Sequence, residues 1–173
     1  MHAIDVTANP RKDEYLAENA GRFTAEAYTI TLDGNHEWKF ERDHVIEVLE
    51  HAINAASIGG VPGDEKKDGS FVQYPHEFRN SELLNLKLYK KEQGTLYEYP
   101  ILLPFMGQRV PFGPPKNPRN PMQPYVFRVV YTINPGSGIA ILQGLIGHKD
   151  KSKDKPKDPE KGSTPFALAK QFY

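Results

Sequence analysis

One stretch of this sequence repeats its apolar residues at the spacing of an α-helix, and most of the remainder consists of short strand-like runs. The helical stretch begins near Asp43, a residue type that can cap a helix, and continues to about Ala56. Its apolar stripe consists of Val45, Val48, Leu49, Ala52 and Ile53. The following SIGGVPGDEKKDGS cannot continue a helix, because of its glycines and proline, and is predicted to be a surface loop. A single helix must therefore cover whatever sheet the strands form.

Strand-like runs lie on both sides of the helix. Before it, FTAEAYTITL and NHEWKF flank an Asp-Gly dipeptide, which is typical of β-hairpin turns. After it, runs rich in Leu, Ile, Val and Tyr lie near 83–89, 95–103, 125–133 and 139–147, and FALAKQFY is expected to add an edge strand. The linkers KKEQG and NPGSG are short enough for antiparallel neighbours. We expect an α+β fold with an N-terminal β-hairpin, one α-helix packed on a central antiparallel sheet of four to five strands, and long loops.

The length of 173 residues suits one domain, which we assign to residues 23–173, with residues 1–22 as an N-terminal arm lying on it. Two segments interrupt the strand pattern. Residues 104–124 form a Pro-rich loop, since prolines lack the donors that a sheet needs. Residues 149–162 form a Lys-rich loop without hydrophobic side chains.

Charge and cysteine content exclude several classes of protein. Lys plus Arg equals Asp plus Glu at 22 each, so any site for anions must be built locally. No apolar run approaches the length of a membrane span, and the first residues lack the pattern of a secretory signal, so we expect no membrane partner. The absence of Cys excludes disulfides and thiolate metal sites. It allows a cytoplasmic protein as well as a secreted chain whose signal has been removed.

Four polar residues stand where the strand pattern would predict apolar ones or where it ends. Glu98 and Arg128 interrupt apolar strands, His76 follows a loop, and His148 terminates a strand. In YEYPI the alternation places Glu98 on the face opposite its aromatic neighbours, so it can share a face with Arg128 if their strands are adjacent. Cleavage of RNA by its own 2′-hydroxyl needs a base, an acid and cations around phosphorus, without a metal. These residue types can supply all of them.

Four motifs resemble those of the fungal T1-type guanyl ribonucleases and their sarcin-like ribotoxin relatives. They are YPHEFRNSE, LYEYPI, PYVFRVVY and GLIGHKD, in the order that the family has them. The resemblance covers roughly residues 23–172 and implies the microbial ribonuclease fold. It also implies an endoribonuclease that cleaves RNA 3′ of guanosine to a 2′,3′-cyclic phosphate, without metal or other cofactor. Of the two compartments that the absence of Cys allows, the resemblance favours secretion.

The resemblance assigns a role to each residue of the candidate site. Glu98 would be the general base and His148 the general acid, while His76 and Arg128 would stabilise the phosphorane. Tyr74 would bind phosphate through its hydroxyl. A charged carboxylate beside an imidazole raises the pKa of the imidazole, so activity should be bell-shaped in pH.

The segment Arg79, Asn80, Ser81 and Glu82 corresponds to the family's base-recognition loop, in which a carboxylate reads guanine. Two features depart from the family. Its disulfides are missing, and Ser81 stands where an aromatic lid is typical, which weakens the expectation of tight guanine stacking. The expected partner is single-stranded or ribosomal RNA, with the ribosome as a further candidate, and the expected state is a monomer.

Two alternatives stay open. The chain could be a ribonuclease-like module that binds RNA or a host protein without catalysis, or a toxin whose activity is confined to one ribosomal RNA loop. The histidines outside the four motifs have simpler interpretations: His44 and His51 are expected on a solvated helix surface, and no pattern of ligands indicates a metal site.

Overall fold

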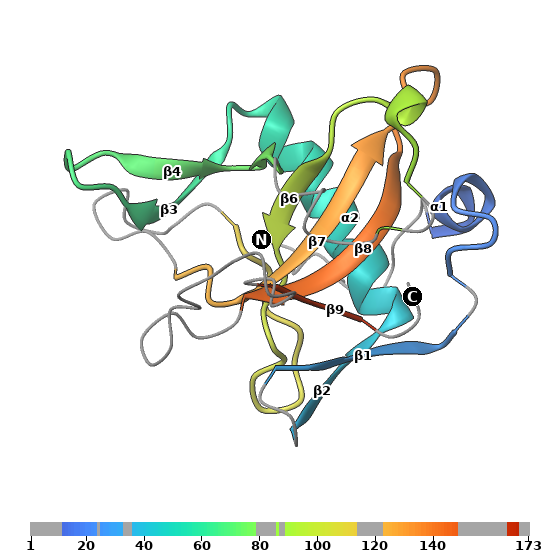
Figure 1. The fold of residues 1–173 in the computed structure, drawn as a ribbon, viewed down its shortest axis with the longest axis horizontal. Coiled ribbons are helices and arrows are strands. Elements are labelled where there is room, and N and C mark those ends of the chain that lie inside the picture. The colour runs from blue at the N-terminus through green and yellow to red at the C-terminus, as the bar shows by residue number, and fades with distance from the viewer. Residues whose placement is uncertain are drawn as a thin grey trace, which may run out of the picture.

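The computed structural model shows an α+β arrangement in which helices cover one side of an antiparallel sheet (Figure 1). It describes residues 12–23, 25–32, 36–78, 86, 89–113, 123–148 and 166–169. The main sheet has five strands in the order β5-β6-β7-β8-β9, all neighbours being antiparallel. Their bounds are β5 His76–Glu77, β6 Tyr97–Pro100, β7 Phe127–Ile133, β8 Ala140–His148 and β9 Phe166–Leu168. The predicted antiparallel sheet is confirmed, including the return of the chain as edge strand β9.

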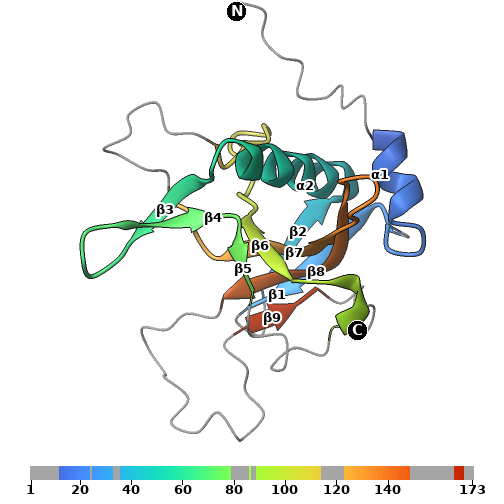
Figure 2. The ribbon, with the colours of Figure 1, turned by 90° about the horizontal axis from the view of Figure 1, so that it is seen from above.

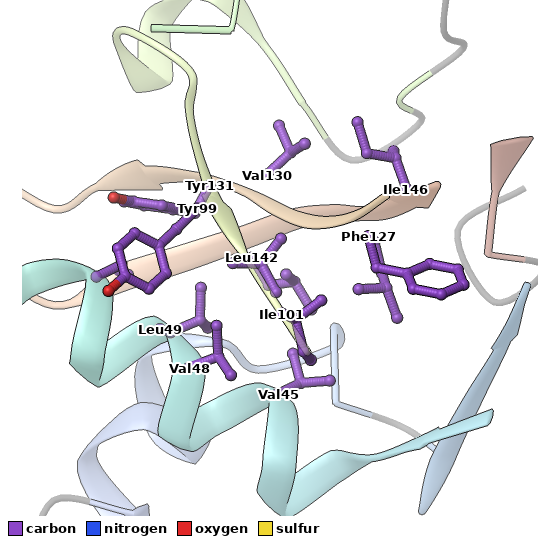
Figure 3. Packing of buried hydrophobic residues seen from close by; sticks show 14 of the residues in the cluster. Val45, Val48, Leu49, Tyr99, Ile101, Phe127, Val130, Tyr131, Leu142 and Ile146 are labelled. Carbon is purple, nitrogen blue, oxygen red and sulfur yellow. The ribbon is translucent and has the colours of Figure 1, made fainter. Parts of the chain in front are cut away.

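Helix α2 (Arg42–Ser57) lies across one face of this sheet (Figures 1 and 2). Figure 3 shows Val45, Val48 and Leu49 of α2 pointing toward the sheet, where Tyr99, Ile101 and Leu142 lie. The helix ends where the sequence predicts, because Gly59 and Gly60 adopt positive φ angles of 90° and 103° and Gly60 N–H bonds back to the Ala55 carbonyl at 2.8 Å. The buried stripe of the predicted helix is thus confirmed.

The start of α2 differs from the prediction. Glu41 occupies the N-cap position without a side-chain cap, and Asp43 lies inside the first turn. There its carboxylate is 2.9 Å from the Lys12 ammonium of α1 (Lys12–Glu18), a second helix that the sequence pattern did not predict. Seven residues with few apolar members are too short for a visible helical stripe, and tertiary contacts stabilise such a helix.

The hairpin of β1 (Ala27–Thr31) and β2 (Glu37–Glu41) is confirmed, with Tyr28 opposite Phe40 and Ile30 opposite Trp38. The prediction of a surface loop after α2 is wrong. Residues Val61–Glu65 (β3) and Phe71–Tyr74 (β4) form a second two-stranded sheet, whose exposed turn carries the charges that suggested a loop. A proline is tolerated in β3 because a two-stranded ribbon has free edges.

The run 83–89 falls mostly outside the described residues. Its described members, Leu86 and Tyr89, belong to no strand, and the neighbour of β6 is β5 instead. The short 3-10 helix η2 (Lys91–Gln93) lies in the linker before β6. The Pro-rich loop is described as far as residue 113 and from residue 123, and the Lys-rich loop 149–162 lies outside the described residues.

His44 contradicts the expectation of a solvated helix surface. Its side chain is 2% exposed on α2, and burial lowers its pKa to about 4. His51 is half-buried, and burial likewise lowers its pKa. Both lie beside Arg109 and Val110 of the Pro-rich loop, which covers this part of the helix, with Arg109 bound to Glu47 at 2.6 Å and to Glu41 at 2.8 Å. The sequence could not show that a distant loop folds back on α2.

Candidate active site on the sheet face opposite helix α2

The register of the main sheet places three of the predicted site residues on one face. His76 of β5 is opposite Glu98 of β6, and Glu98 is opposite Val130 of β7. Paired residues project to the same side of an antiparallel sheet, as do residues two apart along one strand. Arg128, two residues before Val130, therefore shares the face of Glu98 and is its diagonal neighbour. Figure 3 shows Val130 pointing away from α2, so this is the face that the helix does not cover.

His148 lies on the same face, on the next strand of the sheet. Arg128 is opposite Ile146 of β8, and His148 lies two residues further along the same strand. Figure 3 shows Ile146 pointing away from α2, on the side of Val130. The backbone N–H of His148 donates to the Val126 carbonyl at 2.8 Å, which continues the pairing of β8 with β7. The four predicted catalytic residues thus come from four consecutive strands, β5 to β8, and share one face. We call these residues, His76, Glu98, Arg128 and His148, the row.

Glu98 is a buried carboxylate with a charged partner. Its side chain is 7% exposed, and its Oε1 lies 3.0 Å from His76 Nε2. A buried carboxylate is costly without such a partner, and its remaining oxygen keeps the capacity to accept a proton.

His76 is held so that both ring nitrogens face acceptors. Nε2 faces Glu98, and Nδ1 lies 3.0 Å from the Glu77 carbonyl. Only the doubly protonated ring can donate to both acceptors. The pKa of His76 is raised above its ordinary value of 6.5, chiefly by the hydrogen bond to Glu98. Burial opposes this rise, and the hydrogen bond to the Glu77 carbonyl adds to it. The site therefore favours an imidazolium beside the carboxylate.

We expect Glu98→Gln to lower the pKa of His76, because the amide removes the negative charge that favours the imidazolium. The raised pKa means that the pair stabilises the folded state fully below pH 6.5 and that this stabilisation is lost as pH rises through the raised value. NMR titration of the His76 ring in both proteins measures the difference. An unchanged pKa would show that Glu98 does not hold the imidazolium.

Arg128 is buried at 3% exposure and is bound chiefly to backbone. Its Nη1 donates to the carbonyls of Pro124, Tyr125 and Phe127 at 3.1, 2.9 and 2.9 Å, and its Nη2 donates to the Tyr74 hydroxyl at 3.3 Å. No ion pair joins it to Glu98 in the part of the chain that the structure describes. Its buried Nε has no acceptor there either. A guanidinium held in one orientation suits an anionic oxygen.

Tyr74, the predicted phosphate ligand, is fixed by aromatic contacts on the side of His76. Its ring lies 4.8 Å from the His76 ring and 5.6 Å from that of Phe112, between ring centroids. The Tyr74 ring also packs directly on Gly63 of β3, where an added Cβ would lie 2.5 Å from Tyr74 Cε2. The Tyr74–Pro75 peptide bond is cis. Strand β3 and the Pro-rich loop thus position the Tyr74 hydroxyl beside Arg128.

If the chain is the ribonuclease that its motifs resemble, we expect Gly63→Ala to lower its activity several-fold by displacing the Tyr74 ring. We also expect a loss of stability of about 1–3 kcal/mol from overpacking. Gly113→Ala is a matched control, because its added Cβ would meet no atom within 4 Å and its φ lies in the ordinary range. Steady-state kinetics and thermal unfolding of both variants test this. Equal activity in the two variants would mean that activity does not depend on the position of the Tyr74 ring.

The predicted base-recognition residues Arg79, Asn80, Ser81 and Glu82 lie outside the described residues, so the structure says nothing of them. Within the described segments, no group of His, Asp or Glu side chains is placed to hold a metal ion. The helices of those segments include none long and apolar enough to cross a membrane.

Comparisons with known proteins found no match to a protein family, a curated protein or a solved structure.

Sequence reasoning missed two residues beside this site. Phe112 lies in the Pro-rich loop, which we expected to be an irregular excursion, yet its ring packs on both Tyr74 and Tyr99. Tyr125 lies two residues before Phe127, the first residue of β7, and is 71% exposed. The available sequence signal for Tyr125 was an aromatic residue three positions before Arg128, while no local pattern identifies Phe112.

Proposed function

We propose that this chain is an endoribonuclease of the T1 type, which cleaves RNA 3′ of guanosine and leaves a 2′,3′-cyclic phosphate. One observation carries the proposal: the buried Glu98 carboxylate, held by His76 at 3.0 Å, lies on the same sheet face as Arg128 and His148. The order of a hairpin, a long helix and an antiparallel sheet agrees with the microbial ribonuclease fold that the motifs imply. Guanine specificity rests on the resemblance of residues 79–82 alone.

In the proposed reaction, Glu98 removes the proton from the ribose 2′-hydroxyl, and the 2′-oxygen attacks phosphorus. The bond to the 5′-oxygen breaks as His148 protonates that oxygen, so the products are a cyclic phosphate and a free 5′-hydroxyl. In-line displacement requires the base and the acid on opposite sides of phosphorus. The order of the row supports this, because Arg128 lies on the strand between those of Glu98 and His148.

Cations in the row would stabilise the charge that develops on the phosphorane. The imidazolium of His76 is favoured by Glu98 and by the Glu77 carbonyl, and Arg128 contributes the charge of its guanidinium. The bonds of Arg128 to three carbonyls hold the guanidinium in place before substrate binds. Preorganised donors of this kind are usually the largest contribution to catalysis of such a step.

The experiment is to incubate the protein, in EDTA, with guanylyl-3′,5′-cytidine, with adenylyl-3′,5′-cytidine and with intact ribosomes, and to identify the products by chromatography. We expect guanosine 2′,3′-cyclic phosphate and cytidine from the first substrate and slower cleavage of the second. Cleavage of ribosomes alone at low dose would identify a ribosome-directed toxin. Binding of RNA without cleavage of any substrate would overturn the proposal in favour of a binding module.

A further inference from the structure

Tyr125 is an exposed aromatic residue in an unfavourable backbone conformation. Its side chain is 71% exposed, and its φ angle of 52° lies in the left-handed region that residues with a Cβ rarely adopt. A glycine at this position would adopt the same conformation without strain. The chain therefore retains a large ring, open to solvent, where both burial and backbone preference argue against one.

The conformation of Tyr125 is fixed by the candidate site itself. Arg128 Nη1 donates hydrogen bonds to the carbonyls of Pro124, Tyr125 and Phe127. A different backbone path through this turn would break some of these bonds. Strained residues persist where the surrounding structure over-determines them, and they cluster at functional sites. Arg128, which would stabilise the phosphorane in the proposed reaction, thus also holds the backbone of Tyr125.

Tyr125 also lies close in the chain to the backbone that pairs with His148, the member of the row that would act on the leaving group. It is followed by Val126, whose carbonyl accepts the backbone N–H of His148 at 2.8 Å. His148 is the residue that would protonate the departing 5′-oxygen. The nucleoside attached to that oxygen must therefore lie near this end of β7 and β8.

From this placement we propose that Tyr125 is a stacking platform for the base of the leaving nucleoside, so that the site binds RNA on both sides of the scissile phosphate. The inference rests on the proposed function and deepens it. A tyrosine ring stacks on any base, so this subsite would accept all four nucleotides, with purines preferred for their larger overlap. The substrate class is then RNA with at least one nucleotide 3′ of the cleaved bond.

The test compares guanylyl-3′,5′-adenosine with guanosine 3′-(methyl phosphate), a substrate whose leaving group has no base. For each protein, the ratio of kcat/KM on the first substrate to kcat/KM on the second is measured. In Tyr125→Gly we expect this ratio to fall about ten-fold, because one base stack is lost. Tyr125→Phe, which keeps a ring, should retain most of the ratio. Phe105→Ala removes an equally exposed aromatic side chain outside the row and should retain all of it.

Tyr125→Gly is chosen over Tyr125→Ala because glycine relieves the backbone strain, so we expect its melting temperature to match or exceed that of the wild type. A ratio that stays at the wild-type value in Tyr125→Gly would overturn the platform while leaving the proposed function intact. A wild-type protein that cleaves neither substrate would overturn the proposed function, and the platform with it.

Discussion

Replacing Glu98 by Gln is expected to reduce kcat for guanylyl-3′,5′-cytidine by about 10²- to 10⁴-fold, the usual contribution of a general base. The amide is isosteric with the carboxylate, and its oxygen can still accept a hydrogen bond from His76 Nε2, which lies 3.0 Å from Glu98 Oε1. What the amide cannot do is accept the 2′-hydroxyl proton. Activity should therefore fall far more than the stability of the fold.

Glu47→Gln is the matched control for this variant. Glu47 is a second shielded carboxylate, 13% exposed and 2.6 Å from Arg109, but it lies on α2 and outside the row. Because the amide oxygen can still accept a hydrogen bond from Arg109 Nη1, we expect Glu47→Gln to leave the Pro-rich loop on α2 and to change kcat little. Circular dichroism and thermal unfolding of both variants separate loss of function from loss of fold. A Glu98→Gln protein with nearly wild-type kcat would show that the buried carboxylate is structural and that another group removes the proton.

Tyr15→Ala is expected to have the largest effect on stability, about 3–5 kcal/mol less free energy of unfolding, which corresponds to a fall of roughly 10 °C in the melting temperature. Tyr15 is the buried residue of α1, 0% exposed and part of the hydrophobic core. Truncation would leave a cavity where α1 meets α2 and β8. We therefore expect the stability of this Cys-free chain to depend on a segment that its sequence marks only as an arm.

Polar contacts hold α1 in the same place. Asn19 is buried and bonds the carbonyl of Ala140 at 3.0 Å and the N–H of Leu142 at 2.7 Å, both in β8. Asp13→Ala is the control, since Asp13 lies on the exposed side of the same helix and should change the melting temperature by little. Chemical denaturation of both variants gives the two free energies. A Tyr15→Ala protein as stable as Asp13→Ala would mean that α1 packs on the domain without stabilising it.

Local patterns predicted the elements whose signal is long and regular. The stripe from Val45 to Ala52 identified α2, and the apolar runs around Arg128 and before His148 identified β7 and β8. Elements with short or interrupted signals were missed: α1 has only Tyr15 fully buried, and the β3–β4 ribbon carries its apolar residues between charges and glycines. Such elements are stabilised by contacts that their own sequence does not encode.

For the candidate site, the sequence by itself determined the residue types and the side of the strand on which each lies. Alternation alone separates Glu98 from Tyr99, and that separation persists in the sheet because the side-chain period of a strand is two. The expectation that Glu98 and Arg128 can meet on one face depended in addition on their strands being neighbours.

Only the tertiary structure decided which of these residues are partners. It paired Glu98 with His76 through the two-residue strand β5, bound Arg128 to backbone carbonyls and Tyr74, and set Tyr74 on Gly63 and Phe112. A shift of one residue in any strand would turn its site residue to the opposite face. Register is set by pairing between segments far apart in the chain and by the packing of the whole core, and no local pattern of residues contains that information.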